Sequence, residues 1–286
     1  MKKKILIINE VPCHQEIIET VILQYYKILN ISENLPVEIF LSTNELGKKK
    51  RLDFESYIEE KYPEIKFQEI NDYDYYINCT IYQKNLDTGL KIDKSVNSNK
   101  KYIAHDVTDN LKSNPNIFFL TPLAKERFFY ADKLPFAEEK EKSEVPIYII
   151  QGHLLPERRN FKLLINILEN KFKYDFKIKL IGWGEFPNLL KKYKNKIILK
   201  NNLSFKNFHR EFLDGYCILP LISKKKHPYY YKNKLTSTIN YARGYNLKCL
   251  IDNDLQNIYN LNDVEIYNDE NDITIAFEKT LEDFYK

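Results

Sequence analysis

The chain has 286 residues, of which 43% are hydrophobic and 14% aromatic, so it can bury cores for two domains or one large one. Its 44 basic and 40 acidic residues leave a net charge of +4, which does not argue for a dedicated nucleic-acid binder and suits a local basic site for a small anion. The four cysteines lie far apart, and no apolar run is long enough for a secretory signal or a membrane span. We therefore expect a cytoplasmic protein with free thiols and no transmembrane segment, although peripheral membrane contact stays open.

The first half of the chain predicts a parallel sheet. An apolar strand over residues 4–9 precedes an amphipathic helix over residues 14–29, whose apolar side chains share one stripe. Further strands are predicted at 37–42, 65–70, 75–80, 101–106 and 116–122, with a charged helix near 52–61. Short apolar runs separated by helices and loops are typical of a parallel sheet that is covered on both faces.

The second half repeats this rhythm after a charged run at residues 137–146, which ends in proline and is the best linker in the chain. Strands are predicted at 147–152, 176–182, 196–200, 216–221 and 248–252. Helices are predicted at about 159–171, 186–194, 205–213, 236–245, 253–260 and 272–285. This alternation predicts a doubly wound, Rossmann-like domain. We therefore expect an N-terminal Rossmann-like domain over 1–140, a second one over 146–270 and a C-terminal helix within 271–286.

Ligands of such sheets bind at the carboxyl ends of the strands, so the loops that follow strands are the place to seek function. The loop after residues 147–152 reads HLLPERRNFKLL. Gly152 ends the strand, and Arg158, Arg159 and Lys162 lie at or near the next helix start. Positive side chains oppose the helix macrodipole there unless an anion such as a pyrophosphate lies between them. The alternative is a solvated basic surface.

Two later loops add to this pattern. Gly182, followed by a second glycine after one residue, permits a tight turn and a close backbone approach after a strand. Further on, Lys234 precedes Thr236, Ser237 and Thr238 at a predicted helix start. These hydroxyls are favoured helix caps, but a cap needs only one of them. Three hydroxyls next to a lysine therefore also predict a diphosphate at the helix N-terminus, and both interpretations stay open.

The ordered set of Gly152, the Arg159/Lys162 pair, LIGWGEF, YCILPLI and YYKNKLTSTINYARGYNLKCLID resembles the donor half of GT-B fold glycosyltransferases of the group 1 and 4 type. The resemblance covers residues 147–260 well and the first half more weakly. It implies an α/β fold with two Rossmann-like domains facing each other across a cleft. It also implies that Arg159 and Lys162 match the family's Arg/Lys pair and that Ser237 and Thr238 match its helix-start groups.

This resemblance implies an enzyme, a hexosyl- or pentosyltransferase, that moves a sugar from a nucleotide-diphosphate sugar to an acceptor hydroxyl. The donor would be a UDP- or GDP-linked sugar acting as co-substrate, with no other cofactor. The acceptor would be a glycan, a lipid or a protein. No bound metal is expected, because such enzymes usually stabilise the leaving diphosphate with basic residues and helix dipoles, and the sequence offers no second Cys/His cluster to complete a metal site.

In the first half, the stretch NEVPCHQEIIE after the first strand resembles the His-x-Glu stretch of some sugar transferases. His14 and Glu16 would then lie at a strand's carboxyl end, where an acceptor hydroxyl needs a base or an orienting partner. His14 is the better candidate because the ordinary pKa of histidine lies near neutrality. His105, which ends a later strand, could contact the acceptor or the donor sugar. The alternatives are a helix cap at His14 and a structural turn at His105.

Two other functions stay open. The first is a non-catalytic nucleotide-sugar binding protein on the same scaffold, because no glutamate occurs between Ile222 and Asp252, where many retaining transferases carry two. The second is a nucleic-acid binding module, for which the basic loops among many aromatic residues would be the best feature.

Overall fold

The computed structural model describes residues 1–11, 13–43 and 48–286, with the side chains of residues 48–51 left out of the description. The chain forms two compact units. Unit 1 comprises Met1–Lys133 and Asn233–Leu235, and unit 2 comprises Leu134–Lys232 and Thr236–Lys286. Each unit contains one sheet, in which every neighbouring pair of strands is parallel.

The sheet of unit 1 has the strand order β2-β1-β3-β4-β5. Its strands are β1 (Lys3–Ile8), β2 (Val37–Ser42), β3 (Tyr75–Ile81), β4 (Lys100–Ala104) and β5 (Ile117–Phe119). Its helices are α1 (Glu16–Leu29), α2 (Lys48–Lys61), α3 (Gln83–Asp87), α4 (Asp109–Lys112) and the 3-10 helix η1 (Pro122–Ala124). The centre of β1 is fully buried because Ile5, Leu6 and Ile7 are apolar on both faces of the sheet, which is the pattern of a covered parallel strand.

The prediction of one strand in unit 1 is wrong. Residues 65–70 make only an isolated bridge between Phe40 and Lys66 at the edge of the sheet. The physical reason is that Ile65 is the one fully buried side chain of this segment, whereas Lys66, Gln68 and Glu69 are exposed. Such a segment cannot cover both faces of a parallel sheet.

The sheet of unit 2 has the order β11-β10-β9-β6-β7-β8. Its strands are β6 (Ile147–His153), β7 (Lys177–Trp183), β8 (Ile197–Asn201), β9 (Cys217–Ile218), β10 (Lys248–Asp252) and β11 (Val264–Tyr267). Its α-helices are α5 (Phe161–Glu169), α6 (Phe205–Arg210), α7 (Ser237–Gly244), α8 (Asn253–Tyr259) and α9 (Ile273–Tyr285). The 3-10 helices are η2 (Asn188–Lys196) and η3 (Pro228–Tyr231). The α-helix expected at 186–194 is thus a 3-10 helix, in which only Leu190 is buried.

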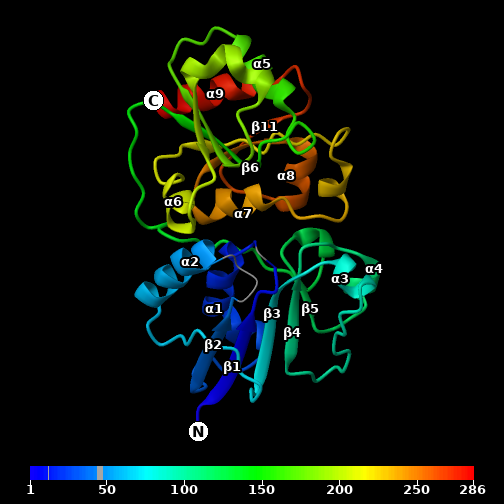
Figure 1. Cartoon of the computed structure of the whole chain (residues 1–286). Helices are drawn as coiled ribbons and strands as arrows, with labels where there is room; N and C mark the ends of the chain where they lie inside the picture. The colour runs from blue at the N-terminus through cyan, green and yellow to red at the C-terminus, as the bar shows by residue number, and fades with distance from the viewer. Residues whose placement is uncertain (12, 44–47) are drawn as a thin grey trace. The chain divides into compact units, whose positions relative to one another are not determined.

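Helix α9 belongs to the core of unit 2 rather than standing apart as a C-terminal appendage. It lies beside α5 (Figure 1) and fully buries Phe277. The ring centroid of Phe277 is 4.2 Å from that of Tyr148 on β6. The Tyr148 hydroxyl also shares a 2.7 Å hydrogen bond with the Thr280 hydroxyl. These contacts join the last helix to a central strand.

Unit 2 begins at Leu134, and hydrogen bonds attach the residues before β6 to it. The Tyr245 hydroxyl donates to the carbonyl of Pro135 at 3.1 Å, and the Glu141 amide donates to the carbonyl of Leu213 at 2.9 Å. The charged run at 137–146 therefore lies along unit 2. Among the described residues, no helix is long and apolar enough to cross a membrane.

We expect Phe277→Ala to destabilise unit 2 by about 3–5 kcal/mol, because it removes a fully buried ring from the core. Trp183, the only tryptophan in the chain, lies in unit 2, so its fluorescence during urea unfolding reports this loss. The control is Ile275→Ala on the same helix, whose side chain is 59% exposed and whose loss should cost less than about 0.5 kcal/mol. Equal effects of the two substitutions would show that α9 is not part of the core.

Candidate functional site

Buried polar atoms without a hydrogen-bond partner gather at the carboxyl ends of the strands. Leaving such an atom unpaired costs about 1–3 kcal/mol, so native proteins usually pair it, often with a ligand. In the described part of unit 1 these atoms are Asn9 Oδ1, Thr80 Oγ1 and His105 Nε2, which lie at or next to the ends of β1, β3 and β4. In unit 2 they are Arg159 Nε, Ser223 Oγ, His227 Nε2 and Asn240 Oδ1, in the loops after β6 and β9 and the first turn of α7.

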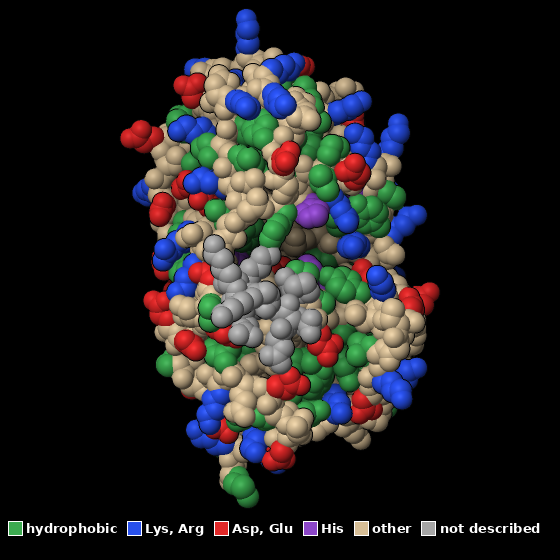
Figure 2. Space-filling model, in the orientation of Figure 1, with side chains coloured by type: hydrophobic (Ala, Val, Ile, Leu, Met, Phe, Trp, Pro, Cys, Tyr) green, Lys and Arg blue, Asp and Glu red, His purple; other side chains and the backbone are tan. Residues whose placement is uncertain are grey.

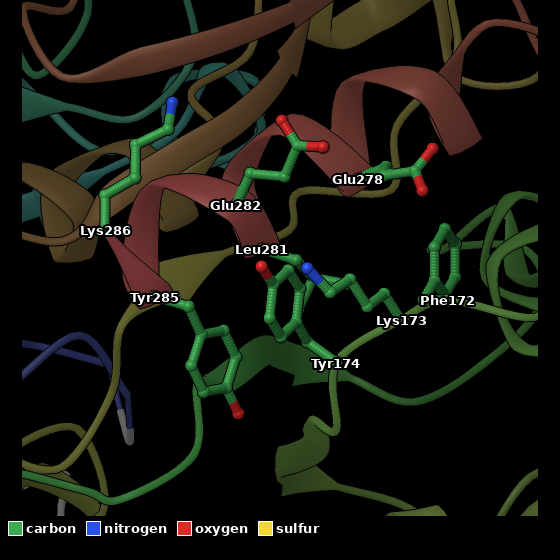
Figure 3. A pocket seen from close by; sticks show the side chains of 8 residues that line it. All are labelled: Phe172, Lys173, Tyr174, Glu278, Leu281, Glu282, Tyr285 and Lys286. Atoms are coloured by element: carbon green, nitrogen blue, oxygen red, sulfur yellow. The ribbon is translucent and has the colours of Figure 1, made fainter.

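On the face seen in Figure 2, basic and acidic side chains are interspersed and form no broad patch of a single sign. A surface hollow of about 200 Å³ in unit 2 is lined by Phe172, Lys173, Tyr174, Glu278, Leu281, Glu282, Tyr285 and Lys286 (Figure 3). It is smaller than a typical ligand pocket and lies next to the amino end of β7. Its lining residues include none of the unpartnered buried atoms. The strand ends are therefore the better candidates.

Two glycines bring β6 and β7 together at their carboxyl ends. Gly152 has φ 115° and Gly182 has φ 148°, values that side-chain-bearing residues rarely adopt. A Cβ on Gly182 would lie 2.0 Å from the carbonyl oxygen of Gly152, and a Cβ on Gly152 would lie 2.5 Å from Arg159 Nη2. The glycines thus allow two backbones and one guanidinium to share this space.

Arg159 is only 5% exposed and is directed back at the end of β6. Its Nη2 donates to the carbonyl of Gln151, and its Nη1 donates to the carbonyl of Arg158 at 2.8 Å. The side-chain oxygen of Gln151 accepts a 3.2 Å hydrogen bond from the hydroxyl of Thr238. Gln151 therefore joins Arg159 to the start of α7. Sequence reasoning missed Gln151, although a lone polar residue near the end of an apolar strand was a visible signal.

The three hydroxyls at the start of α7 differ in their surroundings. Thr236 is the N-cap residue, but its side chain makes no capping hydrogen bond, and it is 2% exposed. Thr238 is fully buried against Gln151, whereas Ser237 is half-buried at the first helical position. Capping by the Thr236 side chain therefore does not account for the hydroxyl run.

The basic residues are less concentrated than expected. Arg158 is half-buried, and the hydroxyls of Tyr229 and Tyr230 raise its pKa against the opposing effect of burial. Lys162 is exposed on the first turn of α5. Lys234 belongs to unit 1, where its backbone forms an isolated antiparallel β-bridge with that of Asp106.

In unit 1, His14, Glu16 and His105 come together. His14 Nδ1 lies 3.2 Å from Glu16 Oε1, and its Nε2 lies 2.7 Å from the hydroxyl of Tyr82. The rings of His14 and His105 are 4.2 Å apart between centroids. The N-cap of α1 is Gln15, so the side chain of His14 is not a helix cap. Sequence reasoning missed Tyr82, a hydroxyl-bearing ring directly after β3.

The two histidines favour opposite protonation states. Burial lowers the pKa of His14, but hydrogen bonds to Cys13 and Glu16 outweigh it and raise that pKa to about 10. The pKa of His105 is held well below its ordinary value by burial first, and then by repulsion from His14 and Lys234. His14 is therefore charged near pH 7 and His105 neutral.

In the described ranges, no group of three or more His, Cys, Asp or Glu side chains is arranged to hold a metal ion. The described cysteines are all free, with Cys13 exposed and Cys79, Cys217 and Cys249 buried.

The chain matches no family model, and no curated protein matches its sequence. Solved structures do match it. AviGT4, a glycosyltransferase involved in avilamycin A biosynthesis, aligns with TM-score 0.57 and 8% identity over 98% of this chain and 88% of its own. HepE of Anabaena in complex with UDP and glucose aligns with TM-score 0.56 and 10% identity over 99% and 91%. The complex of HepE with UDP-glucose aligns with TM-score 0.56 and 11% identity over the same shares.

These alignments span nearly the whole chain and agree with its two parallel, helix-covered sheets. The chain therefore has the GT-B glycosyltransferase fold, which confirms the fold expected from the sequence. At these identities the alignments establish the fold alone.

We expect an NMR titration of the histidines to give a midpoint near pH 10 for His14. His105 should stay neutral at every pH above 6.5, the ordinary pKa of histidine. Because the folded pKa of His14 is raised, its charged form stabilises unit 1 fully below about pH 6.5, and this contribution is lost as the pH rises through about 10. Glu16→Gln should lower the His14 midpoint. His153→Gln, at an exposed histidine of unit 2, should leave it unchanged. A midpoint near 6.5 in the unaltered chain would contradict this assignment.

Proposed function

We propose that this protein is a glycosyltransferase that moves a sugar from a nucleotide-diphosphate sugar to an acceptor hydroxyl. Unit 2 binds the donor, which is a UDP- or GDP-linked sugar. The acceptor is a hydroxyl of a glycan, a lipid or a protein. The reaction is a hexosyl or pentosyl transfer that uses no bound metal and no cofactor beyond the donor.

The observation that carries this proposal is the meeting of Arg159 and Thr238 on Gln151 at the carboxyl end of β6. It places a buried guanidinium and the start of a helix on one strand end, with Arg159 Nε and Asn240 Oδ1 still unpartnered. Helix N-termini and guanidinium groups both favour phosphate oxygens. HepE, which shares the fold, has been crystallised with UDP and glucose and with UDP-glucose, and this supports the same class of ligand here.

In the proposed sugar transfer, negative charge develops on the leaving diphosphate. Arg159, Lys162 and the Ser237/Thr238 helix end stabilise that charge in the transition state, because they supply fixed positive groups and oriented N–H dipoles. Gly152 leaves the space that the guanidinium of Arg159 occupies, Gly182 lets the backbone of Gly152 approach, and Arg158 adds a second positive side chain.

In unit 1, the histidine cluster orients the acceptor hydroxyl. His14 carries a positive charge and is therefore not a base, and because both of its ring nitrogens are engaged, by Glu16 and Tyr82, it acts by positioning the cluster. His105 is neutral, and its Nε2 is buried without a partner, so it is free to hydrogen-bond a substrate hydroxyl. Of the two, His105 has the protonation state that a proton acceptor needs.

We expect Lys162→Ala to weaken binding of UDP or GDP by about tenfold, because it removes one charge-assisted hydrogen bond worth about 1.5 kcal/mol. Isothermal titration calorimetry at constant ionic strength measures this loss. The matched control is Lys177→Ala, which removes another exposed lysine of unit 2 at the amino end of β7 and should change binding less than twofold. Equal losses in both variants would indicate non-specific attraction to a basic surface.

Activity is tested by mixing the protein with a panel of nucleotide sugars and measuring release of the nucleoside diphosphate with candidate acceptors. Release that is reduced at least tenfold by His105→Ala supports the transferase. Tight binding of nucleotide sugars without release, unchanged by His14→Ala, would identify a non-catalytic binding protein instead. Steeply salt-dependent binding to oligonucleotides, with no binding of any nucleotide sugar, would identify a nucleic-acid binding module.

A further inference from the structure

His227 is a buried histidine of unit 2 whose Nδ1 atom has a hydrogen-bond partner and whose Nε2 atom has none. Its side chain is 1% exposed, and its Nδ1 accepts a 3.2 Å hydrogen bond from the backbone N–H of Ser223. A backbone amide can only donate, so Nδ1 carries no proton and the ring is the neutral tautomer with its proton on Nε2. That Nε2–H group is buried without an acceptor.

Two further buried polar atoms of the same loop region also lack a partner. They are Ser223 Oγ, four residues before His227, and Arg159 Nε, in the loop after β6. Tyr230 connects the two loops, because its ring centroid lies 6.4 Å from that of His227 and its hydroxyl interacts with Arg159. His227 and Ser223 therefore border the cluster around Arg159.

Hydrogen bonds hold these loops in place before any ligand binds. The backbone N–H of His227 donates to the carbonyl of Ser223 at 2.8 Å, which closes the turn. The backbone N–H of Asn160 donates to the carbonyl of Leu221 at 2.7 Å, and the Lys226 ammonium donates to Asn160 Oδ1 at 2.7 Å. The turn that carries His227 is thus tied to the start of α5, next to Arg159.

The charge around His227 is largely positive. Burial lowers the pKa of its imidazole, and repulsion from Arg159, Lys226 and Arg158 lowers it further. The carboxylates bonded to this region have other partners. Glu270 accepts a 2.9 Å hydrogen bond from the side-chain amide of Asn160, Asp252 accepts one of 2.8 Å from the hydroxyl of Tyr231, and Asp254 pairs with Lys224 at 3.0 Å. A region with several cations and several unpaired donors is complementary to a ligand that brings oxygen acceptors and negative charge.

We propose that His227, Ser223 and Arg159 form a buried oxyanion subsite of unit 2 that takes one phosphate group of the ligand, with His227 donating from Nε2. This inference rests on the proposed function, because the phosphate is taken to be part of the nucleoside diphosphate. It extends that function by assigning phosphate recognition to the loop after β9, beyond the Arg159/Lys162 pair and the start of α7.

The test compares the unaltered protein with His227→Phe and His227→Gln for binding of UDP, uridine and inorganic pyrophosphate by calorimetry. His227→Phe should weaken UDP and pyrophosphate binding about tenfold and leave any uridine binding unchanged, because it removes a hydrogen bond to a charged acceptor. His227→Gln should retain affinity within about threefold, since an amide can both accept from Ser223 and donate to a phosphate. Urea unfolding followed through Trp183 fluorescence checks that both variants fold.

A second readout separates phosphate contact from a purely structural role. The chain has 5 histidines, so ¹⁵N-labelled imidazoles can be resolved and the His227 signal assigned by its absence in His227→Gln. Pyrophosphate should shift the Nε2 signal of His227 while Nδ1 stays unprotonated. If the unaltered protein and His227→Phe bind UDP equally, or the Nε2 signal does not move, the subsite is refuted while the proposed function stands. If the unaltered protein binds neither nucleoside diphosphates nor pyrophosphate, both fail.

Discussion

The close approach of β6 and β7 at their carboxyl ends is the constraint on which the site of unit 2 depends. Gly182 lies against the carbonyl of Gly152, and Gly152 leaves the space that the guanidinium of Arg159 occupies. A side chain at Gly152 would displace Arg159 from the carbonyl of Gln151, and one at Gly182 would collide with the backbone of Gly152. Gln151 in turn holds Thr238 at the start of α7. Backbone geometry at two positions thus sets the arrangement of side chains from three separate segments.

The unpaired buried atoms are the reason for placing the candidate site at the ends of the strands. A core that leaves Arg159 Nε and His227 Nε2 without partners sacrifices stability, since each desolvated donor costs about 1–3 kcal/mol. The loss is acceptable where a ligand restores the missing hydrogen bonds. Because parallel strands all end at one edge of their sheet, such atoms collect there from loops that are distant in sequence.

Unit 1 shows the same principle with histidines. His14 lies in the loop after β1, and His105 directly follows β4 of the same sheet. Hydrogen bonds to Cys13 and Glu16 favour a charged His14, whereas burial favours a neutral His105. The two rings are in contact, so the positive charge of His14 further disfavours a charge on His105. Two identical side chains of one cluster therefore differ in their protonation state.

The sequence by itself determined the α/β class, most strands, the main helices and the glycine positions, because apolar period and glycine content are local properties. It also singled out Arg159, Thr238, His14 and His105 as candidates. It failed at residues 65–70, where the position at the edge of the sheet decides. Only the tertiary structure shows that Gln151, Tyr82 and His227 lie beside the candidate residues. It also shows that Lys234 belongs to unit 1 and that the pKa of His14 is raised. Burial and partner distance depend on the folding of remote segments, and a local pattern does not contain them.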